Sequence, residues 1–274
     1  MRKIRVAVLD LYDGHPNQGM RGFADILNRF RDEEEPGLQH TVFDVRGKRE
    51  IAEENDFDLF ISSGGPGSPL ESIGSDWEKN YFDLMEAIGA HNTKNPDRKK
   101  HVLFVCHSFQ LWCRHLQFGL VNQRRSTSFG ILPVHMTAQG KQEQVFSGLE
   151  DPFFAVDSRD WQVIQPDEKM MGEKGMHILA IEKERPHVDL ERCLMAIRFS
   201  DAFLGTQFHP EADAQGMKIH LLKPDKKESV IAEHGEEKYN EMLARLEDPD
   251  KIMLTQRTVI PNFLEAAVAS RFHP

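Results

Sequence analysis

Short apolar runs alternate with segments whose apolar residues recur at helical spacing, and this alternation constrains the fold more than any other feature. Continuous apolar runs are typical of strands buried on both faces of a sheet. The predicted strands are Arg5–Leu11, Thr41–Val45, Phe57–Ser62 and His101–Val105. The predicted helices are marked by Met20, Phe23, Leu27 and Phe30, by Tyr81, Leu84, Met85 and Ile88, and by Phe109, Trp112 and Leu116. The alternation predicts an α/β fold with a mostly parallel sheet, covered on both faces, whose ligands bind at the carboxyl ends of the strands.

The second half of the chain has a different pattern. Short apolar segments separated by turn residues predict a smaller antiparallel extension of the sheet. These segments are Gly130–Met136, Phe153–Val156, Met176–Ile181 and Cys193–Phe199, followed by a short strand at Gly205–His209. Towards the end, Tyr239, Met242, Leu243 and Leu246 predict an amphipathic helix. Pro261 is expected at the first position of a last short helix that contains Leu264–Val268.

Composition limits the classes of partner. The formal net charge of −10 disfavours nucleic acid and anionic membranes as partners. No secretory signal is evident, and no apolar run approaches the roughly 18 residues of a membrane span. The three cysteines, at positions 106, 113 and 193, have neither zinc-like nor disulfide-framework spacing. We therefore expect a cytoplasmic protein without a metal or another cofactor.

One cysteine lies where chemistry is expected. Cys106 directly follows the apolar run Val102–Val105, and a helix is predicted to begin immediately after it. A sharp turn from strand to helix is the layout of a nucleophile elbow. The N–H groups at the helix N-terminus also favour a thiolate. The alternative is an inert, buried cysteine.

Two further segments are weak signals alone. His209 and Glu211 are two residues apart at a predicted strand end, so the carboxylate can hold the imidazole in one tautomer. The glycines of Gly64-Gly65-Pro66 can turn backbone N–H groups inward at positive φ, where they would donate to an oxyanion. A surface turn is the alternative in both cases.

In this order and spacing, the three segments resemble those of the class I glutamine amidotransferases, the Cys-His-Glu family that includes the glutaminase domain of GMP synthetase. The family has a Gly-Gly-Pro loop, a Gly-x-Cys-x-Gly-x-Gln elbow and a His-Pro-Glu, here Gly64–Pro66, Phe104–Gln110 and His209–Glu211. The resemblance covers about Lys3–Glu211 and the last helix. It implies a flavodoxin-like three-layer sandwich.

The resemblance also implies the role of each residue. Cys106 would attack the side-chain amide of glutamine, forming a thioester and releasing ammonia. His209 would be the base and then the acid, and Glu211 would orient it. The implied oxyanion donors are the backbone N–H groups of Gly65 and His107, and the implied substrate-binding residues are Gly64, Gln110, Ser158 and Arg159.

Three positions depart from the family pattern. Phe104 and Ser108 replace the glycines that flank the nucleophile. Phe104 either packs beneath the elbow or reshapes the pocket. Arg159 replaces the histidine of a Ser-His pair near the glutamine backbone; it could hold a carboxylate or lie on the surface. The departures leave open whether free glutamine or another γ-glutamyl compound is the substrate.

The expected organisation is one amidotransferase domain over residues 1–274, with residues 212–258 as a C-terminal elaboration. No room remains for a synthetase domain, so we expect ammonia to pass to a separate synthetase subunit or to be released. Two alternatives are a γ-glutamyl hydrolase or peptidase with the same triad, and a catalytically silent binding module. Residues 212–258 are expected to serve partner or self-association, unless their amphipathic helix covers the chain's own sheet.

Overall fold

The computed structural model describes residues 3–185, 190–246, 248 and 251–272. Within them, one sheet has the strand order β2-β1-β3-β4-β9-β8-β7-β5-β6. The five strands from β2 to β9 pair in parallel, and every pairing from β9 to β6 is antiparallel. The parallel strands are β2 (Leu38–Asp44), β1 (Ile4–Asp10), β3 (Leu59–Ser62), β4 (His101–Val105) and β9 (Phe203–Thr206). The predicted α/β sandwich with an antiparallel extension is confirmed.

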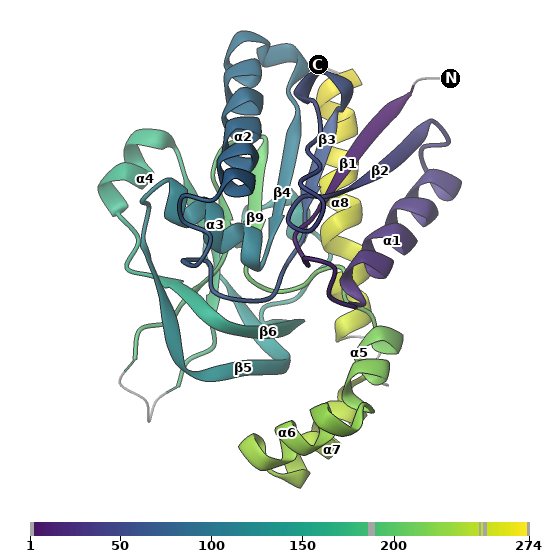
Figure 1. Cartoon of the computed structure of the whole chain (residues 1–274), viewed down its shortest axis with the longest axis vertical. Helices are drawn as coiled ribbons and strands as arrows, with labels where there is room; N and C mark the ends of the chain where they lie inside the picture. Colours follow the sequence, from purple (N-terminus) through teal and green to yellow (C-terminus); the bar gives the residue numbers. More distant parts are fainter. Residues whose placement is uncertain (1–2, 186–189, 247, 249–250, 273–274) are drawn as a thin grey trace.

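Helices cover both faces of the parallel strands (Figure 1). Along β1, Val6 and Val8 join one core cluster, while Ala7 and Leu9 join the other, as the two-residue period of a strand requires. The first cluster packs under α1 (Gly19–Glu33) and α8 (Ile252–Phe272). The second packs under α2 (Asp76–Lys94) and α3 (His107–His115). Burial on both faces explains why these strands are continuous apolar runs.

The antiparallel extension is larger than the sequence indicated. Its strands are β5 (Leu120–Met136), β6 (Phe153–Ile164), β7 (His177–Glu182) and β8 (Leu194–Arg198), with α4 (Glu168–Lys174) between β6 and β7. The predicted segments Gly130–Met136 and Phe153–Val156 are each only one end of a long strand. Their other halves are polar, and exposed residues alternate with buried ones in β6 from Asp157 to Asp160.

The C-terminal segment is helical. It consists of α5 (Ala214–Leu221), α6 (Pro224–His234) and α7 (Glu236–Leu246), which lead to α8. Of residues 212–258, positions 247, 249 and 250 lie outside the described residues. Pro261 lies inside α8, so its prediction as the first helical residue was wrong. Burial explains the difference: Val259, Ile260, Phe263 and Leu264 are fully buried on the sheet, and this packing holds the helix through the proline.

The amphipathic helix α7 covers the chain's own sheet. Tyr239, Met242 and Leu246 are buried in one cluster with Ile131 of β5 and Val156 of β6. The Tyr239 hydroxyl donates to the Leu221 carbonyl at 3.1 Å, which ties α7 to α5. The alternative given for this helix is therefore the one observed, and its apolar face needs no second chain for cover.

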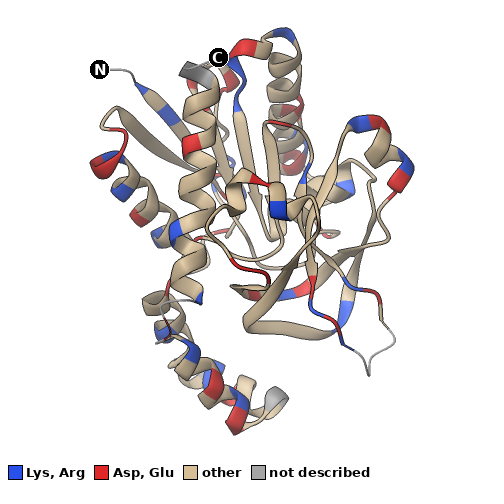
Figure 2. Cartoon of the chain, turned by 180° about the vertical axis from the view of Figure 1, so that it is seen from behind, with Lys and Arg blue, Asp and Glu red and all other residues tan. Residues whose placement is uncertain are grey.

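Charge lies mainly on the outer helices and loops, while the central strands carry few charged residues (Figure 2). No helix in the described part of the chain combines the length and apolar character that crossing a bilayer requires.

Helix α1 lies unusually close to the turn that follows β9. A Cβ placed on Gly22 would fall against the Glu211 carbonyl oxygen, inside contact distance. At Gly19 a Cβ would lie 2.6 Å from the Tyr12 hydroxyl and 3.1 Å from Glu211 Oε1. These two glycines bring the N-terminus of α1 against residue 211.

Gly22→Ala is expected to lower the free energy of unfolding by about 1–3 kcal/mol, because the new methyl group overpacks a buried backbone contact. Gly89→Ala in α2 is the matched control. No atom lies within 4 Å of a Cβ placed there, so alanine should stabilise the protein by about 0.5–1 kcal/mol. Urea denaturation of both variants measures the difference. Equal stabilisation by the two substitutions would contradict the close approach.

Candidate active site

The predicted site segments converge at the carboxyl edge of the parallel strands. Strand β4 lies between β3 and β9, so the residues after these three strands are neighbours at one edge. Gly64 follows β3, Cys106 follows β4, and His209 follows β9. A cavity of about 630 Å³ opens there, and Cys106, His209 and Glu211 all line it. The pairing of parallel strands thus assembles a site from segments far apart in the sequence.

Cys106 forms the predicted elbow. Its φ of 50° and ψ of −98° lie outside the regions that L-residues ordinarily occupy, and α3 begins at the next residue. Its N–H donates to the Thr206 carbonyl at 2.7 Å, which fixes the turn to β9. A sharp turn between strand and helix of this kind is the predicted elbow. Because Cys106 is the N-cap of α3, the N–H groups of the first turn, which have no helical partner, begin directly beside it.

The two residues that replace glycines support the elbow from below. Phe104 is fully buried and stacks on Trp112, with ring centroids 5.3 Å apart and planes inclined by 10°. It therefore packs beneath the elbow rather than in the cavity. The Ser108 hydroxyl donates to the Ser62 carbonyl at 2.8 Å and accepts from the Val105 N–H at 2.8 Å. Ser108 thereby ties the elbow to β3.

His209 and Glu211 form the predicted pair. His209 Nδ1 lies 2.8 Å from Glu211 Oε1, and a carboxylate only accepts, so Nδ1 donates and Nε2 remains for Cys106. The His209 N–H donates to the Val156 carbonyl at 2.9 Å, which anchors this residue to β6. A Cβ placed on Gly64 would lie 2.9 Å from His209 Cε1 and 3.6 Å from Cys106 Cβ, so both side chains flank one point.

The two histidines nearest the thiol have opposite charge preferences. Burial opposes a charge on His209, but Glu211 and Cys106 outweigh it and raise the pKa of His209 well above its usual value. Burial, with Arg46 and Arg114 nearby, lowers the pKa of His107 to about 3. Of the two rings, His209 therefore favours its charged form and His107 its neutral form.

The backbone conformation of the Gly64-Gly65-Pro66 loop differs from the prediction. Positive φ was expected at its glycines, but neither Gly64 nor Gly65 has it, and only Gly67 in this loop does, at 90°. The glycines instead allow close approach, because a Cβ on Gly65 would collide with the Leu11 carbonyl. Arg46 Nη1 donates to the Leu11 and Pro66 carbonyls at 3.1 and 2.8 Å and fixes the loop. Gly65 lines the cavity.

Gln110 is held by the protein itself. Its Nε2 donates to Gln207 Oε1 and to the Trp161 carbonyl, both at 3.2 Å. Gln207 Nε2 in turn lies 3.7 Å from Cys106 Sγ. Gln110 lines the cavity as predicted, while Gln207, which was not singled out in the sequence, makes the contact with the thiol.

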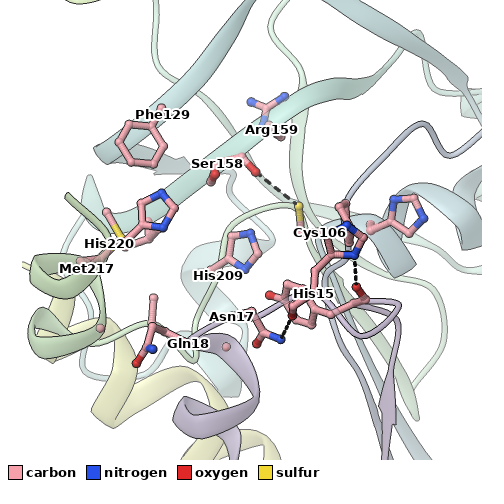
Figure 3. A pocket seen from close by; sticks show the side chains of 18 of the residues that line it. His15, Asn17, Gln18, Cys106, Phe129, Ser158, Arg159, His209, Met217 and His220 are labelled. Atoms are coloured by element: carbon pink, nitrogen blue, oxygen red, sulfur yellow. Dashed lines mark hydrogen bonds between the residues drawn. The ribbon is translucent and has the colours of Figure 1, made fainter. Parts of the chain in front are cut away.

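Ser158 and Arg159 both line the cavity, but only one of them faces it. The Ser158 carbonyl lies 3.9 Å from Cys106 Sγ. Arg159 turns away (Figure 3). Its guanidinium is 1% exposed and donates to Asp157 Oδ1 at 2.8 Å and to the Trp161 carbonyl at 3.2 Å. Neither interpretation of Arg159 was right: it is not on the surface, and its charge is held by Asp157.

The sequence did not indicate two other parts of the site. Tyr12 follows β1 and lines the cavity; burial, with Glu211, Cys106 and Asp10 nearby, raises its pKa well above the usual value, so it stays a neutral donor. Helices α5 and α6 form a whole wall, through residues that include Met217, His220 and Val230. The only signal for this wall was that the segment starts directly after Glu211.

The opposite behaviour of the two histidines can be measured by NMR titration of ring resonances. His209 should stay protonated through neutral pH, and His107 should stay neutral down to about pH 3. In Glu211→Gln the pKa of His209 should fall, because the carboxylate that favours the charged ring is gone while burial still disfavours it. A raised folded pKa contributes stability below the unfolded value of about 6.5, and this contribution is lost as the pH rises through the folded pKa. An unchanged His209 titration in Glu211→Gln would contradict this assignment.

Several solved structures resemble this chain in fold. A protein called SMU.1228c superposes with a TM-score of 0.64 at 18% identity, covering 97% of this chain and 100% of that one. A glutamine amidotransferase from Thermotoga maritima gives 0.67 at 17%, covering 98% and 99%. A Thermoplasma acidophilum protein, assigned as one subunit of GMP synthase, gives 0.59 at 15%, covering 99% and 97%. These similarities show the fold. A search of curated protein sequences found no significant match.

A sequence profile supplies the family. The profile described as "Glutamine amidotransferase class-I" matches residues 26–227, which is most of the chain. The matched range contains the Gly64 loop, the Cys106 elbow and the His209–Glu211 pair. The chain therefore belongs to the class I glutamine amidotransferase family.

Proposed function

We propose that this chain hydrolyses the side-chain amide of glutamine through a thioester on Cys106 and releases ammonia. One observation carries the proposal: the only cysteine at the cavity lies at a positive-φ elbow, beside a histidine held by a buried carboxylate, within the described residues. This arrangement activates a thiol for attack on a carbonyl carbon. The role of each residue follows from its position.

The proposed reaction begins when Cys106 Sγ attacks the amide carbonyl carbon. The carbonyl oxygen takes the negative charge and accepts hydrogen bonds from the backbone N–H groups of His107 and Gly65. One such donor contributes about 10²–10³-fold to the rate. His209 then gives its proton to the departing nitrogen, and the C–N bond breaks. Water, deprotonated by His209, hydrolyses the thioester to glutamate and restores the thiol. Glu211 keeps the ring oriented throughout.

The ammonia acceptor is proposed to be a synthetase. The family supports this partner, as does the similarity in fold to a protein assigned as one subunit of GMP synthase. Ammonia transfer to such a synthetase would make this chain the glutaminase component of a larger assembly.

The cavity favours a second candidate, hydrolysis of an N-substituted γ-glutamyl amide. At about 630 Å³, its volume falls within the roughly 300–1,000 Å³ of sites that enclose drug-sized ligands. The chemistry at Cys106 is the same in both cases. The two candidates differ only in the group that leaves.

A glutamine analogue with an electrophilic diazoketone in place of the amide should alkylate Cys106 and leave Cys113 and Cys193 unmodified. Burial raises the pKa of Cys113 well above its usual value and that of Cys193 to about 12, so neither forms a thiolate at neutral pH. Mass spectrometry of the digested protein locates the label. The two buried cysteines are internal controls, and equal labelling of all three would argue against an activated thiol.

A second assay measures the release of glutamate from glutamine. Cys106→Ala should abolish release, and His209→Asn should lower kcat by roughly 10²–10⁴-fold, the usual contribution of a general base. Folding is checked by circular dichroism. No release from the unmodified protein, together with no labelling of Cys106, would support a catalytically silent binding module instead.

A further inference from the structure

The cavity continues beyond Cys106 and His209 into a compartment formed by the C-terminal helices. We define this leaving-group compartment by the residues Phe129, Met217, His220, Lys223, Lys226 and Val230, all of which line the same cavity. Figure 3 shows His209 between Cys106 on one side and Met217 and His220 on the other, with Phe129 across from them. The compartment is therefore on the His209 side of the thiol.

The wall of this compartment is firmly attached to the rest of the site. Asp213 caps α5 by accepting the Gly216 N–H at 2.6 Å, and it also pairs with Arg21 of α1 at 2.6 Å. Met217 and Leu221 are buried in the same cluster as Ile131 and Val156 of the sheet. The rings of Phe129 and His220 contact each other, with centroids 5.6 Å apart. Helix α5 is thus held against α1 and the sheet, as a fixed part of the cavity wall.

The direction of the reaction assigns this compartment to the departing amine. The proton that His209 donates goes to the leaving nitrogen, so the substituent on that nitrogen lies on the His209 side of the bond that breaks. The carbonyl oxygen would face the N–H groups of Gly65 and His107, which the proposed reaction assigns to it. Ammonia is a single heavy atom and needs no space of this kind.

The lining indicates the chemistry of the amine. Phe129, Met217 and Val230 offer apolar surface. At the outer rim, Lys223 and Lys226 have no ion-pair partner among the described residues, and both are exposed.

The two aspartates that line the cavity, Asp160 and Asp213, are engaged by other groups. Asp213 is held by Arg21 and the Gly216 N–H, and Asp160 accepts the Thr127 hydroxyl at 2.6 Å. Lys227, on the same helix, instead lies over the Tyr239 ring at 5.5 Å. Among the described residues that line the cavity, Lys223 and Lys226 therefore remain to pair with a negative group.

We propose that this site prefers, over glutamine itself, a γ-glutamyl amide whose leaving amine has an apolar or aromatic body and a carboxylate, bound in the leaving-group compartment with the carboxylate at Lys223 and Lys226. This inference rests on the proposed thioester chemistry at Cys106 and names the substrate class for it. Sγ forms a bond to the γ-carbonyl carbon, the C–N bond breaks, and the amine leaves with the His209 proton. Water then releases glutamate.

The test compares glutamate release from three substrates: glutamine, γ-glutamylanilide and the γ-glutamyl amide of para-aminobenzoate. The expected order of kcat/KM is aminobenzoate, then anilide, then glutamine. The double variant Lys223→Gln/Lys226→Gln should lower kcat/KM for the aminobenzoate amide roughly five- to tenfold, as two exposed ion pairs allow. The ratio of kcat/KM for the aminobenzoate amide to that for the anilide should fall by a similar factor. The aminobenzoate advantage over the anilide should also shrink as salt is added.

Lys227→Gln is the matched control, because this lysine is on the same helix and does not line the cavity. It should change none of the three values. Glutamine cleaved at least as efficiently as both aryl amides, or a double variant with unchanged selectivity, overturns the compartment and leaves the thioester proposal standing. Cleavage of none of the three also overturns it. Labelling of Cys106 by the diazoketone then decides separately whether the nucleophile is active.

Discussion

The parallel pairing of β4 with β3 on one side and β9 on the other is the constraint on which this site depends. The Cys106 N–H donates to the Thr206 carbonyl at 2.7 Å, as the last link of that pairing. The bond holds Cys106 level with the end of β9, and the turn after β9 then brings His209 beside it. The Gly64 loop is positioned in the same way by β3. None of these groups could meet if the strands were shifted in register, because a one-residue shift reverses the direction of every side chain.

The charged groups of the site form two sets, one around His209 and one around the buried Arg159. His209 lies between Cys106 and Glu211, and both neighbours favour a positive charge on its ring. Behind them, Arg159 is bound to Asp157 and lies 3.7 Å from Glu182, which also pairs with Arg124. Removing one member of such a buried network leaves an unpaired charge, which costs more than the network contributes. These buried pairs make the antiparallel extension a rigid support for the wall that faces Cys106.

Much of the fold and the centre of the site could be predicted from sequence because local pattern determines them. Buried parallel strands are continuous apolar runs, and a cysteine between such a run and a helix has few other arrangements. The misses arose where distant contacts decide the structure. Gly65 is needed for close approach to Leu11, a residue of another strand's loop. Arg159 is buried because Asp157 and Glu182 face it, and Pro261 continues a helix because the sheet packs along it. The polar halves of β5 and β6, and the wall formed by α5 and α6, have no local signature at all.

The strained backbone of Cys106 has a consequence for how the protein matures. A φ of 50° with a ψ of −98° has no local support and persists only when surrounding structure enforces it. That structure comes from β3 and β9, which are distant in sequence, and contacts of this kind form late in folding. The thiol of a partly folded chain therefore lacks both its elbow and its histidine and behaves as an ordinary cysteine. The arrangement proposed for catalysis is therefore complete only in the folded chain.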